Sequence, residues 1–245
     1  MRRILLKGLI VLFAVVLPGS LAAQDIMAQA DALYDQGGLD NLLKSAELYA
    51  QASESDPASY EAAWKASRSY REYSNQSKEN KVEGWEGICK QYGKMGMMYG
   101  EKAIALNPDR VEGHFWYGCS VGNYSDGVSV LTALREGLKD KTQTSFEKSY
   151  EIDKSYTTGG PIKALGRFWY VLPWPLSDEE KAISYLKEFN QAYPDDAEGQ
   201  VFLAEALIDS GGEENMAQAK VLLDQASVCE ERYFSEWAKR LMADL

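Results

Sequence analysis

The fold is decided by residues 96–121, which read GMMYGEKAIALNPDRVEGHFWYGCSV. Two amphipathic helical patterns occupy this stretch, and a break at Asn107-Pro108 separates them. Small or aromatic side chains recur on one face of each pattern: Gly96, Gly100 and Ala103 before the break, and Tyr117, Gly118 and Val121 after it. Because small residues let two helix backbones approach closely, the stretch predicts a pair of tightly packed helices.

The same arrangement recurs along the chain. Similar breaks lie at Asp56-Pro57, Asp153-Lys154 and Tyr193-Pro194. An Asp or Asn before Pro suits a turn between helices, since the polar side chain can cap and Pro at a first helical position gives up an unpartnered amide. Equivalent triplets flank these breaks: Ala66, Ser67 and Tyr70; Thr142, Phe146 and Ser149; Leu165, Gly166 and Trp169; Ala182, Leu186 and Phe189; Leu203, Ala204 and Leu207. This pattern resembles the two helices of a tetratricopeptide (TPR) repeat.

The predicted fold class is therefore all-α, a TPR-like solenoid of four to five helix pairs in a single domain over residues 24–245. We expect helix pairs at 26–57, 58–107, 110–154, 160–194 and 197–229, with a C-terminal capping helix at 232–244. The anchors Ser67, Gly118, Gly166 and Ala204 lie 51, 48 and 38 residues apart, more than the usual period of about 34. We place the extra residues in insertions at 124–140 and at 172–176, where Leu-Pro-Trp-Pro-Leu cannot be helical.

Residues 1–23 have the pattern of a signal peptide. A basic head with Arg2, Arg3 and Lys7 precedes an apolar run over residues 9–17, and small residues follow. We expect cleavage after Ala22 or Ala23 and export to a bacterial periplasm as a soluble protein. A retained N-terminal anchor is the alternative, and no Cys follows the apolar run to accept a lipid.

Composition narrows the function. The 245-residue chain has 26 basic and 37 acidic residues and a net charge of −11, which argues against binding to nucleic acid. One His and three Cys provide little material for a metal site or a catalytic centre, so we expect no metal, no cofactor and no enzymatic activity. We interpret His114 as a packed, hydrogen-bonded residue. Cys89, Cys119 and Cys229 are expected to be buried free thiols, with one disulfide and a leftover thiol as the alternative.

Several segments resemble the T components of TPR-associated TRAP transporters. They are HFWYG at 114–118, LTAL at 131–134, FEKSYEID at 146–153 and GGPIKALGRFWYVLP at 159–173. The family-like positions are Gly159, Gly160, Pro161, Gly166, Arg167, Leu172 and Pro173. The resemblance implies a periplasmic helical-repeat protein that partners the solute-binding subunit of a secondary transporter.

TPR geometry predicts which side chains line the concave face: Trp64, Arg68, Arg71, Phe115, Cys119, Lys163, Arg167, Tyr170, Val201, Glu205 and Ile208. Aromatic and basic groups together suit a peptide segment, or an apolar ligand with an acidic end. The alternative is that Arg167 pairs with Glu205 across adjacent repeats while the aromatics complete the core. Gly159-Gly160-Pro161 either presents amides to an anion or makes a turn that only glycine allows, with Pro161 starting the helix.

We therefore expect a non-catalytic interaction module that docks a solute-binding protein. Homo-oligomers of this chain are a further expectation. The alternatives are a binding protein whose apolar or lipid-like ligand lies in a channel roofed by residues 124–140 and Trp174, and a general TPR assembly scaffold.

Overall fold

The computed structural model describes residues 18–245, and every regular element within that range is a helix. The twelve helices are α1 (Pro18–Gln36), α2 (Leu39–Ser55), α3 (Tyr60–Glu79), α4 (Trp85–Leu106), α5 (Val111–Asp126), α6 (Val130–Arg135), α7 (Leu138–Asp153), α8 (Tyr156–Val171), α9 (Glu179–Ala192), α10 (Ala197–Ser210), α11 (Glu213–Ala226) and α12 (Arg232–Ala243). The all-α prediction is confirmed.

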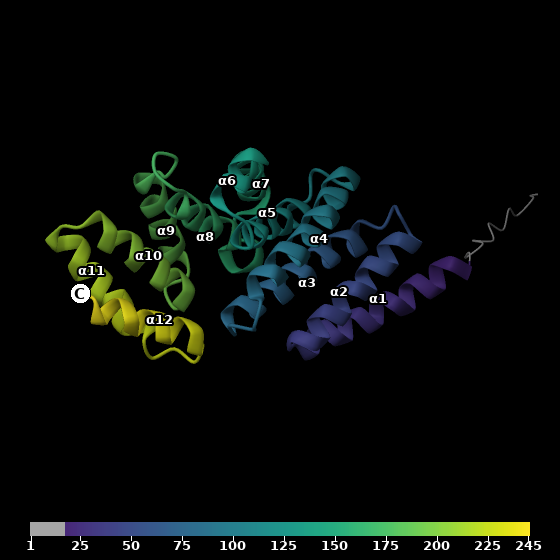
Figure 1. The fold of residues 1–245 in the computed structure, drawn as a ribbon, viewed down its shortest axis with the longest axis horizontal. Coiled ribbons are helices and arrows are strands. Elements are labelled where there is room, and N and C mark those ends of the chain that lie inside the picture. Colours follow the sequence, from purple (N-terminus) through teal and green to yellow (C-terminus); the bar gives the residue numbers. More distant parts are fainter. Residues whose placement is uncertain (1–17) are drawn as a thin grey trace, which may run out of the picture.

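The helices pack in sequential pairs: α1 with α2, α3 with α4, α5 with α7, α8 with α9, and α10 with α11. These are the five pairs that the sequence predicts, and α12 follows them as the capping helix. Figure 1 shows the pairs stacked into a long, curved array, with α1 at one end and α11 at the other. In the same view α12 lies below α10 and turns back toward the connection between α3 and α4.

Close contacts between glycines and neighbouring helices hold the array together. A Cβ at Gly93 of α4 would lie 2.6 Å from the backbone nitrogen of Tyr124, and one at Gly100 would lie 2.8 Å from the Cβ of Tyr117. Because both neighbours belong to α5, these glycines bring α4 and α5 nearly into backbone contact. The predicted spacing of small residues therefore sets the distance between repeats.

The second helix of each pair buries the face that its triplet predicts. In α9, Ala182, Leu186 and Phe189 are fully buried, and in α7 Phe146 and Ser149 are buried. Leu186 belongs to the apolar cluster that joins α9, α10, α11 and α12. Each triplet thus links its own pair to the next one, as stacked repeats require.

The turns differ from the prediction in one respect. Asp56 and Asn107 end α2 and α4 as C-caps, and the prolines that follow them lie in the turns rather than at first helical positions. The next helices start later, α3 after the N-cap Ser59 and α5 after Arg110. At the Tyr193-Pro194 turn, α10 likewise starts after Asp196, and the side chains of Ser59 and Asp196 accept hydrogen bonds from the amides of Ala62 and Gly199. The reason is that Pro shortly after a C-cap prevents the preceding helix from continuing.

Both predicted insertions occur between the helices of a pair. The segment 124–140 contains the short helix α6, and residues 172–178 form an irregular loop between α8 and α9. Trp174 in this loop is 89% exposed.

The start of α8 explains the two adjacent glycines. Thr157, Thr158 and Gly159 have φ angles of 47°, 57° and 76°, so the chain makes a left-handed turn before regular helix resumes at Gly160. A Cβ at Gly160 would lie 2.7 Å from the Cζ of Phe115. The glycines therefore serve the turn and the close packing of α8 on α5, and Pro161 lies in the first turn of the resumed helix.

The basic head and apolar run of the predicted signal peptide lie outside the described residues. The described chain begins at Pro18, and α1 continues through the predicted cleavage positions Ala22 and Ala23. Among residues 18–245, no helix combines the length and the apolar character that a membrane crossing requires.

Two glycines of α5 provide a matched test of the packing. A Cβ at Gly118 would lie 2.6 Å from the buried ring of Phe146, whereas one at Gly122 would have no neighbour within 4 Å. We expect Gly118→Ala to lower the free energy of unfolding by about 1–3 kcal/mol through overpacking. Gly122→Ala should raise it by about 0.5–1 kcal/mol through reduced chain entropy. Urea denaturation measures both, and equal effects of the two substitutions would contradict the packing described.

Candidate functional site

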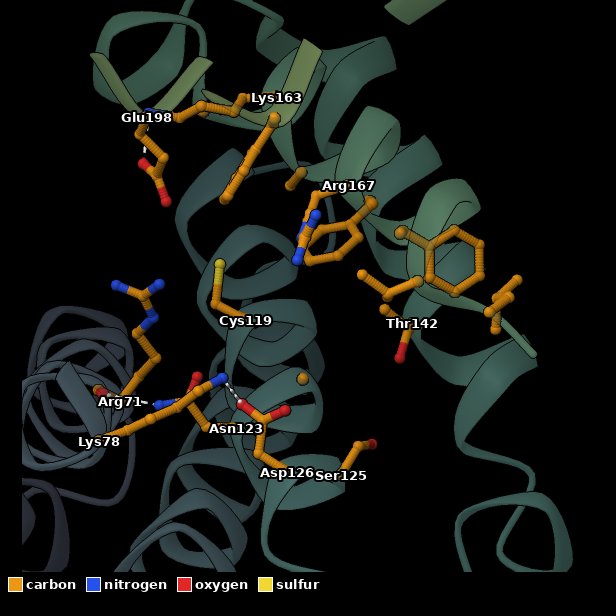
Figure 2. A pocket seen from close by; sticks show the side chains of 18 of the residues that line it. Arg71, Lys78, Cys119, Asn123, Ser125, Asp126, Thr142, Lys163, Arg167 and Glu198 are labelled. Carbon is orange, nitrogen blue, oxygen red and sulfur yellow. Dashed lines mark hydrogen bonds and ion pairs between the residues drawn. The ribbon is translucent and has the colours of Figure 1, made fainter. Parts of the chain in front are cut away.

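A cleft of about 630 Å³ lies on the concave side of the array. Helices α3, α5, α8 and α10 line it, α6 and α7 bound one side, and α12 contributes Tyr233, Phe234 and Trp237. The cleft therefore collects residues from both halves of the chain. Figure 2 shows Arg71 of α3, Cys119 of α5 and Arg167 of α8 projecting toward the same space, with Lys163 reaching along its edge to Glu198.

Most cations of the cleft already have carboxylate partners. Lys78 lies 2.6 Å from Asp126, and Lys163 lies 2.6 Å from Glu198. Lys163 also contacts Asp196 at 3.2 Å. Burial opposes the charge of Lys163, but these two carboxylates outweigh it and raise its pKa above the ordinary lysine value. The walls thus carry paired charges rather than one continuous basic patch.

Arg167 occupies the centre of an aromatic cluster. Its guanidinium pairs with Glu205 of α10 and lies 4.5 Å from the ring centroid of Phe202 and 5.3 Å from that of Trp237. One side chain thereby joins α8, α10 and α12 through an ion pair and cation–π contacts. This confirms the pairing of Arg167 with Glu205 that the sequence offers as the alternative.

Arg71 is less completely satisfied. Its Nη1 lies 2.8 Å from Glu72, while its Nε is buried without a hydrogen-bond partner. Burial opposes its charge, but the nearby carboxylates of Glu72 and Glu198 hold the pKa above the ordinary arginine value. Figure 2 shows Arg71 and Glu198 pointing toward one another from opposite walls. An unpaired buried donor of a charged group is costly, so Arg71 is the strongest candidate to contact a ligand.

Glu79 lines the cleft on the same helix. Its carboxylate accepts a hydrogen bond of 2.6 Å from the Asn75 side-chain nitrogen. Burial raises its pKa above the ordinary glutamate value, and Arg71 opposes this only in part. Among the ion pairs of residues 18–245, none involves Glu79.

The remaining wall of the cleft is apolar. Its main members are Leu134, Leu138, Phe146, Phe168, Val171 and Leu172. Cys119 lies between this wall and the charged groups, and burial raises the pKa of its thiol to about 12. A thiol with that pKa stays protonated at neutral pH, which makes it a poor nucleophile.

Only part of the predicted set lines the cleft. The predicted residues that do are Arg71, Phe115, Cys119, Gly160, Lys163, Arg167, Leu172 and Pro173. The predicted residues outside its lining are Trp64, Arg68, Gly159, Pro161, Gly166, Tyr170, Val201, Glu205 and Ile208. The Arg68 guanidinium stacks 3.7 Å from the ring centroid of Tyr34 in α1, and the Tyr170 hydroxyl donates to Asp209. The channel hypothesis requires residues 124–140 and Trp174 to roof the cleft. Residues of α6 and the start of α7 do border it, but Trp174 lies outside the lining.

Helix α12 does more than the sequence predicts. Residues 232–244 are expected only to cap the array, whereas Tyr233, Phe234 and Trp237 line the cleft. The available signal is the row of aromatic residues at helical spacing in the last helix, which a cap alone does not need.

Few groups could carry out chemistry here. Within residues 18–245, no three His, Cys, Asp or Glu side chains are grouped so as to hold a metal ion. His114 is buried and its Nε2 lies 2.8 Å from the Pro108 carbonyl oxygen, as a packed histidine should. All three cysteines lie in the described part of the chain and none forms a disulfide; Cys89 is buried, whereas Cys119 and Cys229 are partly exposed.

Comparisons with known proteins now place the chain. The family model "Regulator of microtubule dynamics protein 1-3" matches residues 26–172, from α1 to the loop after α8. The chain belongs to this family. Regulator of microtubule dynamics protein 1 of Mus musculus is 25% identical over 203 residues, and that of Pongo abelii is 26% identical over 200 residues. Each match covers 74% of this chain but only 60% and 58%, respectively, of the relative.

Solved structures support the fold of this family member. TTC0263, a thermophilic TPR protein of Thermus thermophilus, aligns with a TM-score of 0.62 at 15% identity, covering 90% of this chain and 99% of that one. YrrB, "a TPR protein with an unusual peptide-binding site", aligns with a TM-score of 0.51 at 14% identity, covering 91% and 98%. The TPR-like solenoid is therefore confirmed.

The family corrects two expectations from the sequence. Export to a bacterial periplasm is wrong, because the relatives that the chain matches are named regulator of microtubule dynamics protein 1 and come from Mus musculus and Pongo abelii, animals whose cells have no periplasm. Membership of the TRAP T family is the second, because the matching family model is a different one and the comparisons support only the TPR-like fold.

The Arg167–Glu205 pair can be tested by a double-mutant cycle. Arg167→Met should lower the free energy of unfolding by about 2–4 kcal/mol, because it leaves the largely buried carboxylate of Glu205 without its partner. In the Glu205→Gln background, the loss in the free energy of unfolding caused by Arg167→Met should be about 1–2 kcal/mol smaller. Additive effects in urea denaturation would show that the two side chains do not interact.

Proposed function

We propose that this family member is a non-catalytic helical-repeat adaptor that binds a short segment of another protein in its concave cleft. The observation that carries the proposal is the cleft itself, which joins charged and apolar walls from several of the stacked elements. Concave faces of helical repeats are extended binding surfaces, and this one has its polar groups placed by the repeat packing.

The mixture of groups favours a peptide. Polar side chains such as Asn123 and Thr142 lie among the aromatic and aliphatic ones, so the lining offers hydrogen bonds as well as apolar contact. Aromatic and arginine side chains also dominate binding energy at protein interfaces, and Arg71, Phe115 and Trp237 provide them here.

The family indicates where to look for the partner. The relatives are named as regulators of microtubule dynamics, so proteins associated with microtubules form the first set of candidates. The chain spans less than two thirds of the length of those relatives. We propose, from the family, that it shares their role in microtubule dynamics. A solute-binding subunit of a TRAP transporter, which the sequence resemblance implies, has no support from the comparisons.

A substitution that fills the cleft tests the proposal. Ala164 of α8 lines the cleft, whereas Ala217 of α11 is exposed on an outer helix. We expect Ala164→Trp to abolish or weaken at least tenfold the binding of partners recovered with the unaltered chain, because the indole occupies their place. The Ala217→Trp variant should bind like the unaltered chain.

The measurement is affinity capture from animal cell extract, followed by titration calorimetry with each recovered partner in purified form. Circular dichroism establishes that both variants are folded. Equal binding by the two tryptophan variants would refute the cleft as the binding site.

The apolar wall favours a second candidate, a small amphiphile bound in the same cleft. Leu134, Leu138, Phe168 and Val171 could hold its chain, while Arg71 meets an acidic end. Native mass spectrometry of the purified full chain should then show a retained ligand that is absent from Ala164→Trp. A protein purified without ligand and unable to take up a fatty acid would eliminate this candidate.

A further inference from the structure

The two incompletely satisfied charges of the cleft lie on one helix. Arg71 and Glu79 both belong to α3 and both line the cleft. They are eight residues apart, which corresponds to about 12 Å along a helix axis. The cleft therefore receives a cation and an anion from two positions of α3 that lie about two helical turns apart.

Arg71 has no hydrogen-bond acceptor for its buried Nε, and Glu79 has no ion-pair partner among residues 18–245. Arg71 donates to Glu72 from its Nη1, and within residues 18–245 its buried Nε donates no hydrogen bond. Glu79 has a hydrogen bond from Asn75 but no cation, although Lys78 beside it is paired with Asp126. By contrast, Lys163 and Arg167 on the opposite wall are already paired with Glu198 and Glu205.

This pattern argues against a peptide segment that carries only one kind of charge. A purely acidic segment would place a carboxylate near Glu79, where burial already disfavours the charge. A purely basic segment would place a second positive charge beside Arg71, which like-charge repulsion disfavours. A segment that brings an acidic group to Arg71 and a basic group to Glu79 satisfies both, and buried charge pairs of this kind give an interface its specificity.

The spacing translates into a sequence requirement. An extended peptide advances about 3.3 Å per residue, so about 12 Å corresponds to about three to four residues. Cys119, Gly122 and Asn123 of α5, the helix that packs beside α3, also line the cleft. The apolar side chains of α6, α7 and α8 lie across the cleft and can receive one apolar residue of the segment.

Resting on the proposed function, we infer that the segment bound in the cleft is bipolar: it carries an acidic residue that meets Arg71 and, about three to four positions away, a basic residue that meets Glu79. Arg71 and Glu79 are thus specificity-determining residues, and their order on α3 also fixes the direction in which the segment lies.

The test is selection of a random peptide library on the immobilised full chain, with Ala164→Trp as the negative selection. We expect enriched peptides to carry one acidic and one basic residue at the stated spacing. Replacing either residue of an enriched peptide by Gln should weaken binding to the unaltered chain at least tenfold in fluorescence anisotropy. The variant Glu79→Gln should lose the preference for the basic residue only, and Arg71→Gln the preference for the acidic one only.

Control variants exclude a general charge effect. Lys44→Gln and Glu47→Gln change exposed charges on α2 and should leave peptide binding unchanged. The double variant Arg71→Glu/Glu79→Arg keeps the net charge and should prefer peptides in which the acidic and basic residues are exchanged. Melting curves identify any variant that fails to fold, and the peptide substitutions on the unaltered chain do not depend on those variants.

The outcomes separate this inference from the proposed function. Enriched peptides without a paired charge pattern, or with a preference that Glu79→Gln leaves intact, would overturn the bipolar segment while peptide binding stands. Failure to enrich any peptide over Ala164→Trp would refute peptide binding in the cleft and the inference with it.

Discussion

The close approach of α4 and α5 is the constraint on which the rest of the structure depends. Gly93, Gly96 and Gly100 of α4 meet Tyr124, Ser120 and Tyr117 of α5 with no room for a larger side chain. This contact fixes how the second helix pair stacks on the third. It thereby determines where α3 and α5, the inner helices of those pairs, face the cleft.

The cleft follows from this stacking and from its closure by α12. Inner helices of successive pairs bring their side chains to one concave side, and α12 turns back to add aromatic side chains there. Arg167 stabilises the closure because its guanidinium contacts α10 and α12 at once. Arg71 and Glu79, on the wall formed by α3, are the charged groups that this network leaves incompletely paired.

The sequence predicts the fold far better than the site. Triplets such as Ala182, Leu186 and Phe189 reveal the helix pairs because burial at a fixed helical spacing leaves a direct trace in residue size. The site depends on which cations are already neutralised by residues far along the chain, as Arg167 is by Glu205, and no local pattern records this. The same segments mislead about the family, since glycine and aromatic residues in repeat helices report close packing that unrelated helical-repeat proteins share.

Hydrogen–deuterium exchange of the full chain, with and without a saturating enriched peptide, tests the central claim most directly. If the concave cleft is the binding site, protection should increase in the cleft-lining parts of α3, α5, α8 and α12 and remain unchanged in the outer helices α2, α9 and α11. Protection confined to the outer helices, or no change on saturation, would contradict the account.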